Sequence, residues 1–156
     1  MAIPKRQTPF FDLKTLAKSL ELKSIDVIKT SGTDIESHWF RSKGPADLYF
    51  WRAENRIVKQ QVSLYNQVIQ WNEYDGVKTG YVNDDRSLSK KEVICFDEEV
   101  NKEVVAQAIE LLQNAGHLEK ALTKQLIRHF EFYNQWQGLQ LRLWLKKLLR
   151  RFFKAP

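Results

Sequence analysis

Residues 47–82 read DLYFWRAENRIVKQQVSLYNQVIQWNEYDGVKTGYV, and this stretch decides the fold class. Its apolar segments are short and rich in β-branched and aromatic residues, and residues typical of turns separate them. We expect strands at 47–53, 56–64, 67–71 and 77–82. Because the connections are too short for a crossover helix, these strands should form an antiparallel meander.

Two of the connections, Glu54-Asn55 and Tyr65-Asn66, have the length of two-residue hairpin turns. Such turns would place Trp51 opposite Val58, and the alternation of side chains would then assign each residue to a face of the sheet. The expected core face comprises Tyr49, Trp51, Val58, Val62, Ile69 and Trp71. The expected reverse face comprises Phe50, Ile57, Lys59, Gln61, Ser63, Val68 and Gln70.

On the N-terminal side of this stretch, residues 1–8 are expected to be a loose leader. Thr8 is a candidate N-cap, and Pro9 suits the first position of a short amphipathic helix through Leu20. Residues 24–29 and 34–41 are expected to be strands on either side of a turn at 31–33.

On the C-terminal side, residues 92–96 are expected to add a strand. Asp97 and the acidic residues after it suit the start of a helix, and Gly116 suits its end. A second helix is expected from Leu118. Gly138 alone would not stop it from continuing into the tail, because one glycine costs a helix only about 1 kcal/mol relative to alanine.

The predicted architecture is α+β. It comprises an N-terminal helix, an antiparallel meander of about four to six strands, two helices packed on one sheet face, and a basic amphipathic C-terminal helix. Residues 1–138 are expected to form a single domain, and residues 139–156 the basic helix.

The composition is that of an ordinary globular domain, with 43% hydrophobic and 28% charged residues. One cysteine, Cys95, allows no internal disulfide, and charges at Lys5 and Arg6 and beyond interrupt any signal-peptide core. No stretch approaches the roughly 20 apolar residues that span a bilayer. We therefore expect a cytoplasmic chain whose membrane contact, if any, is made from the surface.

Residues that carry enzyme chemistry are sparse. His38, His117 and His129 lack cysteine or acidic partners at the spacing of metal ligands, and the six glycines form no phosphate-binding motif. Cys95 is expected to be a small buried hydrophobic residue, and His129 a solvated one. The sequence therefore predicts no catalytic residue, no metal site and no cofactor, and a chain that is not an enzyme.

The aromatic residues of the meander admit three interpretations. They could pack in the core, or line an aromatic cup for a small ligand beneath the helices. The cup would be formed by Trp39, Tyr49, Trp51 and Trp71. Alternatively, the reverse face of the sheet could dock another protein. This candidate docking face comprises Phe50, Ile57, Lys59, Gln61 and Gln70.

The last eighteen residues, LQLRLWLKKLLRRFFKAP from Leu139 to Pro156, hold six cations and no acid. The chain has 25 basic and 19 acidic residues, so the formal excess of +6 lies entirely in this segment. Wound as a helix, the segment is amphipathic. Its apolar side comprises Leu141, Trp144, Leu145, Leu148, Leu149 and Phe152. Its cationic side comprises Arg142, Lys146, Lys147, Arg150, Arg151 and Lys154.

These twelve residues are the candidate membrane- or partner-binding site. A cationic amphipathic helix can lie on an anionic membrane surface, or fill an acidic-rimmed hydrophobic groove of a protein partner or a second copy. It can also pack on its own domain. Nucleic acid is disfavoured as a partner, because phosphate contacts do not use the apolar side.

The predicted function is a non-enzymatic cytoplasmic protein-interaction module that the C-terminal helix brings to an anionic membrane surface. One alternative is a soluble adaptor or chaperone-like domain whose C-terminal helix docks in a protein groove or self-associates. A remoter alternative is a small-ligand binder that uses the aromatic sheet.

Overall fold

The computed structural model describes residues 12–30, 32–83 and 93–132, and in these residues the fold is α+β. A seven-stranded antiparallel sheet runs in sequence order from β1 to β7, together with three helices. The predicted class and the N-terminal helix are confirmed, and the sheet has one strand more than the expected four to six. The elements are α1 Leu13–Lys18, β1 Glu21–Thr30, β2 Thr33–Arg41, β3 Ala46–Ala53, β4 Arg56–Leu64, β5 Gln67–Asn72, β6 Gly76–Asn83, β7 Val93–Phe96, α2 Lys102–Gln113 and α3 Lys120–Glu131.

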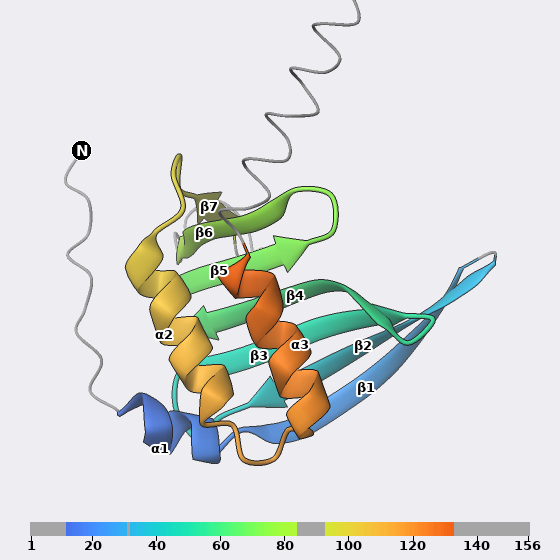
Figure 1. Cartoon of the computed structure of the whole chain (residues 1–156), viewed down its shortest axis with the longest axis horizontal. Coiled ribbons are helices and arrows are strands. Elements are labelled where there is room, and N and C mark those ends of the chain that lie inside the picture. Colours follow the sequence, from blue (N-terminus) through green and yellow to red (C-terminus); the bar gives the residue numbers. More distant parts are fainter. Residues whose placement is uncertain (1–11, 31, 84–92, 133–156) are drawn as a thin grey trace, which may run out of the picture.

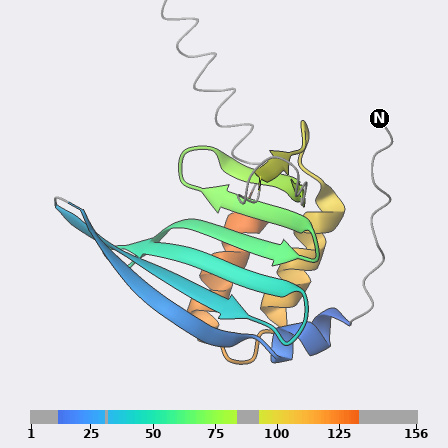
Figure 2. The same ribbon diagram turned by 180° about the vertical axis from the view of Figure 1, so that it is seen from behind.

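The described helices lie on one side of the sheet. Helices α2 and α3 cross the same face side by side, and α1 lies at one end of the layer (Figure 1). The opposite face is seen from behind in Figure 2, where no described helix covers it. The β1–β2 hairpin extends well beyond the helices in both views.

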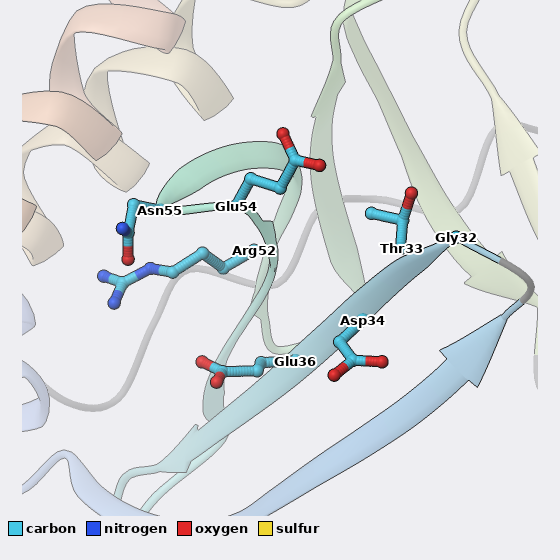
Figure 3. A pocket seen from close by; sticks show the side chains of 7 residues that line it. All are labelled: Gly32, Thr33, Asp34, Glu36, Arg52, Glu54 and Asn55. Carbon is cyan, nitrogen blue, oxygen red and sulfur yellow. The ribbon is translucent and has the colours of Figure 1, made fainter.

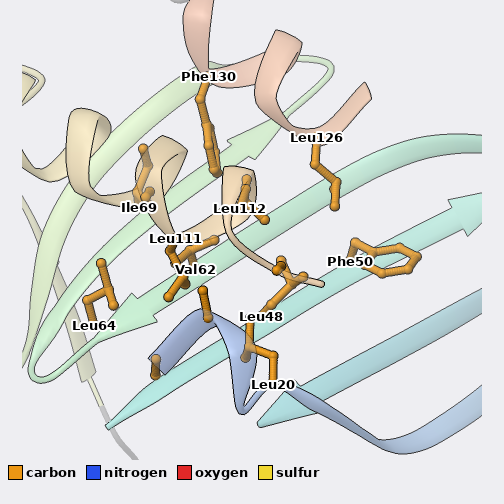
Figure 4. Packing of buried hydrophobic residues seen from close by; sticks show 14 of the residues in the cluster. Leu20, Leu48, Phe50, Val62, Leu64, Ile69, Leu111, Leu112, Leu126 and Phe130 are labelled. Carbon is orange, nitrogen blue, oxygen red and sulfur yellow. The ribbon is translucent and has the colours of Figure 1, made fainter. Parts of the chain in front are cut away.

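The core lies between the helices and the sheet (Figure 4). Leu111 and Leu112 of α2 and Phe130 of α3 are fully buried against the strands. Burying a large apolar side chain contributes about 1.5–3 kcal/mol, so this contact between helices and sheet supplies much of the stability. The sheet contributes Leu48, Phe50, Ile57, Val62, Leu64, Ile69, Trp71 and Val77.

The predicted faces of β3 are wrong, because the register of β3 against β4 differs by one residue from the expected one. Arg52 pairs with Ile57 and Trp51 pairs with Lys59, so Val58 is an extra residue in β4. This bulge reverses the side chains of β3 relative to the rest of β4. The next hairpin has the expected register, with Val62 opposite Ile69.

Two residues of the candidate docking face therefore lie in the core. Phe50 and Ile57 are each 1% exposed, whereas Tyr49 and Trp51, which were expected in the core, lie on the helix-free side and are partly exposed. A single extra residue moves the side chains of a whole strand to the opposite face of the sheet. No residue type in the sequence marks the position of this bulge.

The turn between β3 and β4 has the predicted length. Ala53 pairs with Arg56, and both residues between them adopt the left-handed region, with φ of 49° at Glu54 and 66° at Asn55. Positive φ at both central positions is the geometry of a type I′ hairpin turn, whose twist matches that of the strands.

Helix α2 starts later than expected. The side chain of Asn101 caps it, accepting hydrogen bonds from the backbone N–H groups of Glu103 and Val104 at 3.0 and 3.3 Å. Asp97 instead accepts a hydrogen bond from the hydroxyl of Thr79 at 2.7 Å. Asp97 is thus held against β6 and does not cap the helix, which begins at Lys102.

Several predictions concern residues outside the described ranges. They are the loose leader at 1–8, the helix start at Pro9, the domain boundary at Gly138 and the basic helix at 139–156.

Candidate functional site

The candidate site is the side of the sheet that no helix of the described residues covers, which we call the open face. Strand pairing and the alternation of side chains assign its residues. They include Trp39 and Arg41 of β2, Asp47, Tyr49 and Trp51 of β3, Lys59, Gln61 and Ser63 of β4, Gln70 of β5, Lys78 and Val82 of β6, and Ile94 and Phe96 of β7.

Three aromatic rings form a row on this face. Trp39 and Tyr49 are directly paired across β2 and β3, and their nearly parallel rings lie 5.7 Å apart. Tyr49 and Trp51 are two residues apart on β3, with ring centroids at 6.3 Å. Stacked cross-strand aromatic pairs contribute about 0.5–1.5 kcal/mol each, so the row is rigid as well as partly exposed.

A cation lies over the ring at each end of this row. The guanidinium of Arg41 is 5.3 Å from the Trp39 ring, and the ammonium of Lys59 is 4.8 Å from the Trp51 ring. At the Trp51 end a ligand would meet the ammonium of Lys59, whereas Arg41 at the other end is paired with Asp47. The Trp51 end therefore favours an acidic group.

One carboxylate fixes the geometry at the Trp39 end. Asp47 accepts a hydrogen bond from Nε1 of Trp39 at 2.9 Å and forms an ion pair with Nε of Arg41 at 3.1 Å. A shared oxygen thus holds the indole and the guanidinium in place. The positions of both groups are set before any partner binds.

A groove of about 680 Å³ runs along this face toward β7, which is a volume typical of ligand sites. Its walls combine amides, hydroxyls and carbonyl groups with aromatic and aliphatic surface. The lining residues are Arg41, Pro45, Asp47, Tyr49, Trp51, Gln61, Ser63, Tyr65, Asn66, Val82 and Ile94.

The sequence predicted part of this face. Lys59, Gln61 and Gln70 of the candidate docking face do lie on it, whereas Phe50 and Ile57 lie in the core. The most distinctive features, the aromatic row and the groove, were missed because the β4 bulge was not anticipated. Cross-strand pairing of β2 with β3 would have been the signal, since it places aromatic residues opposite one another. The twelve tail residues from Leu141 to Lys154 lie outside the described residues.

The expected aromatic cup does not exist as a single site. Trp39, Tyr49 and Trp51 lie on the open face, but Trp71 lies on the helix side, where its ring stacks on His129 at 3.7 Å. Because the sheet separates these rings, they cannot enclose one ligand together.

His129 is partly buried rather than solvated, and a polar network holds it. The amide nitrogen of the fully buried Gln60 donates to the carbonyl of Leu126 at 2.8 Å, so its oxygen faces Nδ1 of His129 at 2.9 Å. The imidazole must therefore donate from Nδ1. Burial lowers the pKa of His129 to about 4, and the charge of Arg128 acts in the same direction. The neutral ring thus serves packing.

The other residues considered for chemistry have structural surroundings. His38 stacks on Phe50 at 4.5 Å, and its Nε2 lies 3.4 Å from a carboxylate oxygen of Glu36. Cys95 is partly exposed rather than buried as expected. Within residues 12–30, 32–83 and 93–132, no three His, Cys, Asp or Glu side chains gather as a metal site would require.

A second hollow, of about 520 Å³, lies between the β1–β2 and β3–β4 hairpins on the helix side of the sheet (Figure 3). Three carboxylates, those of Asp34, Glu36 and Glu54, surround it together with Arg52. Its mixed charges and open shape indicate a solvated recess between two turns.

Comparison of the chain with protein-family models, curated proteins and solved structures finds no match in any of the three. None of the helices in the described part of the chain is long and apolar enough to cross a bilayer. We therefore infer the function from the geometry of the open face and from the charge pattern of the sequence.

Proposed function

We propose that the protein is a non-enzymatic, cytoplasmic interaction module. In this proposal the open face binds a protein partner, and residues 139–154 hold the chain at an anionic membrane surface. The observation that carries it is the confinement of the entire +6 charge excess to one amphipathic end of the chain.

The open face supports the first half of the proposal. Arg41 and Lys59 end a rigid aromatic row, and the neighbouring groove offers amides and hydroxyls to a polar backbone. Tryptophan, tyrosine and arginine are the residues that most often dominate protein interfaces. A partner segment with an acidic side chain fits this surface best, because a carboxylate can pair with Lys59 at the Trp51 end, while Arg41 is already paired with Asp47.

The tail supports the second half. A cation close to an anionic membrane contributes about 1 kcal/mol, so six could contribute about 6 kcal/mol before apolar burial is counted. Trp144 and Phe152 suit the headgroup boundary, where an amphipathic helix lies in the plane of the interface.

Co-sedimentation with anionic vesicles at low and high salt tests the membrane half. The full chain should pellet at low salt and much less at high salt, and a chain ending at Gly138 should stay in the supernatant. A variant with Arg150, Arg151 and Lys154 changed to glutamine keeps the apolar side and should lose most of the binding. Neutral vesicles are the matched control, and equal pelleting of the full and shortened chains would refute the anchor.

The second candidate is a soluble adaptor whose C-terminal helix docks in an acidic-rimmed hydrophobic groove or self-associates. The apolar side of the segment favours it, because groove recognition uses such spacing. The dependence of binding on salt concentration distinguishes the two candidates. Membrane binding should weaken steeply as salt is added, whereas apolar docking should persist.

A small-ligand binder that uses the aromatic surface is the remaining alternative. It would require a compound that quenches tryptophan fluorescence in the full chain and not in a Trp51→Leu variant.

A further inference from the structure

Strand β1 is a long edge strand that is exposed along almost its whole length. It pairs with β2 and, within the described residues, has no strand on its other side. Of its side chains, Leu22 is 48% exposed, Ile25 50%, Val27 52% and Ile28 52%. Apolar residues of this kind on an open edge are an interaction surface.

Among the described residues, no strand pairs with the outward-facing backbone groups of β1. The β1–β2 hairpin closes at Thr30 and Thr33 with two residues between them, so hydrogen-bonded pairs alternate with non-bonded pairs from that point. Ile25, Val27 and Lys29 then direct their N–H and C=O groups away from β2. Another strand can pair with these groups without disturbing the sheet.

The two edges of the sheet differ in how they are protected. The opposite edge, β7, is only 4 residues long. Strand β1 has 10 residues, and its register irregularity lies between Leu22 and Ser24, so the remainder is regular up to the turn. A short edge strand blocks pairing with other chains, whereas a long regular one permits it.

The open edge is also placed where a partner can reach it. The β1–β2 hairpin extends beyond α2 and α3 (Figure 1), so no described helix covers Ile25 and Val27 on the helix side. A neighbouring strand would cover these two side chains as well as the backbone.

We propose that β1 pairs with β1 of a second copy of this chain, antiparallel and centred on Val27. The regular residues 24–30 then pair over their full length. Ile25 lies opposite Lys29 of the second copy, whose aliphatic stem can cover it, and Asp26 lies opposite Ile28. No like charges face each other in this register.

Neighbouring registers of the β1–β1 pair are less favourable. Centring the pair on Asp26 puts two carboxylates directly opposite, which is destabilising. Centring it on Ile25 brings the irregularity at Leu22 and Ser24 into the paired segment. Centring it on Ile28 leaves only residues 26–30 to pair before the turn. The charge pattern, the bulge and the turn thus select Val27 as the centre.

Antiparallel pairing of two identical edges creates a two-fold axis perpendicular to the sheet. The sheets of the two copies become continuous, with both helix layers on one side and both open faces on the other. The dimer would present two aromatic rows to the same surface. This inference does not depend on the proposed function, because it concerns the edge rather than the open face or the tail.

Cross-linking tests the register directly. In the full chain with Cys95→Ser, a cysteine at Val27 should give a covalent dimer on mild oxidation. Residues paired at the centre have Cα atoms about 5.5 Å apart, within the range that disulfides span. The matched control is Tyr74→Cys, an exposed position in the turn before β6. Equal cross-linking at 27 and 74 would overturn the register.

Sedimentation or light scattering of the unmodified full chain tests the dimer itself. One strand per copy makes a small interface, so we expect dimerisation between about 1 and 100 μM. Val27→Lys should raise the dissociation constant at least about tenfold, since two lysines would lie directly opposite each other at the centre of the pair, while Tyr74→Lys should leave it unchanged. Circular dichroism identifies folded variants. A chain that is monomeric throughout this range, or a folded Val27→Lys variant that dimerises normally, would refute the proposal.

Discussion

The network of Gln60, His129 and Trp71 makes the stability of the domain dependent on pH. Burial lowers the pKa of His129 to about 4 from an ordinary value of 6.5. Between these two values the unfolded chain binds a proton at this site and the folded chain does not. The free energy of unfolding therefore falls as the pH is lowered from 6.5 toward 4, and it is insensitive to this residue above that window.

The magnitude follows from the same two values. Their difference corresponds to at most about 3.4 kcal/mol, because one pKa unit equals about 1.36 kcal/mol. The ring is partly exposed, so water screens the effect, and we expect about 1–2 kcal/mol. A protonated ring could still donate from Nδ1 to Gln60, so the loss comes from the burial of the charge beside Arg128.

Urea denaturation at pH 7 and pH 4.5 measures this contribution. His129→Gln removes the titrating group and keeps a side chain able to donate to Gln60, so it should lose about 1–2 kcal/mol less than the unmodified protein on acidification. Titrating carboxylates affect both proteins equally and cancel in the comparison. His117→Gln is the matched control, because that histidine is exposed and should not alter the response. If the His129→Gln variant and the unmodified chain lost the same stability on acidification, His129 would not be the source of the pH dependence.

Three further predictions concern the sheet and are measured by chemical denaturation. Phe50→Ala should lower the free energy of unfolding by about 3–5 kcal/mol and Tyr49→Ala by about 1–2 kcal/mol, because only Phe50 is in the core. A larger loss for Tyr49→Ala than for Phe50→Ala would contradict the observed register. Gly80→Ala should destabilise the protein by about 1–3 kcal/mol, since an added Cβ would lie 2.9 Å from the Cα of Phe96; an unchanged midpoint would show that β7 can move aside freely. Glu54→Asn should stabilise by about 0.5–1 kcal/mol, because φ is 49° there; a loss of stability would argue against the type I′ turn.

The sequence alone was sufficient for the meander and its hairpins. The turn at Glu54-Asn55 and the pairing of Val62 with Ile69 were predicted, since short connections and β-rich segments are local properties. Asn101 as the cap of α2 was not predicted, because Asp97 is an equally good cap by residue type. The tertiary structure holds Asp97 against Thr79 of β6, and the helix begins only at Lys102, after Asn101.

The candidate site depended more on the tertiary structure. A bulge at Val58 exchanges the faces of β3, and with them the positions of Phe50 and Tyr49. The energy of such a bulge depends on which side chains the helices bury, and that is not encoded in any local pattern. The exposure of β1 likewise depends on where the helices end above the sheet.

The sequence by itself determined the fold class, the positions of the central strands along the chain and the cationic character of residues 139–156, because residue periodicity and charge are properties of the chain. The tertiary structure alone decided which aromatic residues reach the open face and which are buried with His129. It also decided that β1 is left as a long exposed edge. The physical reason is that register and burial are settled by packing between distant segments, and a one-residue shift there exchanges inside and outside.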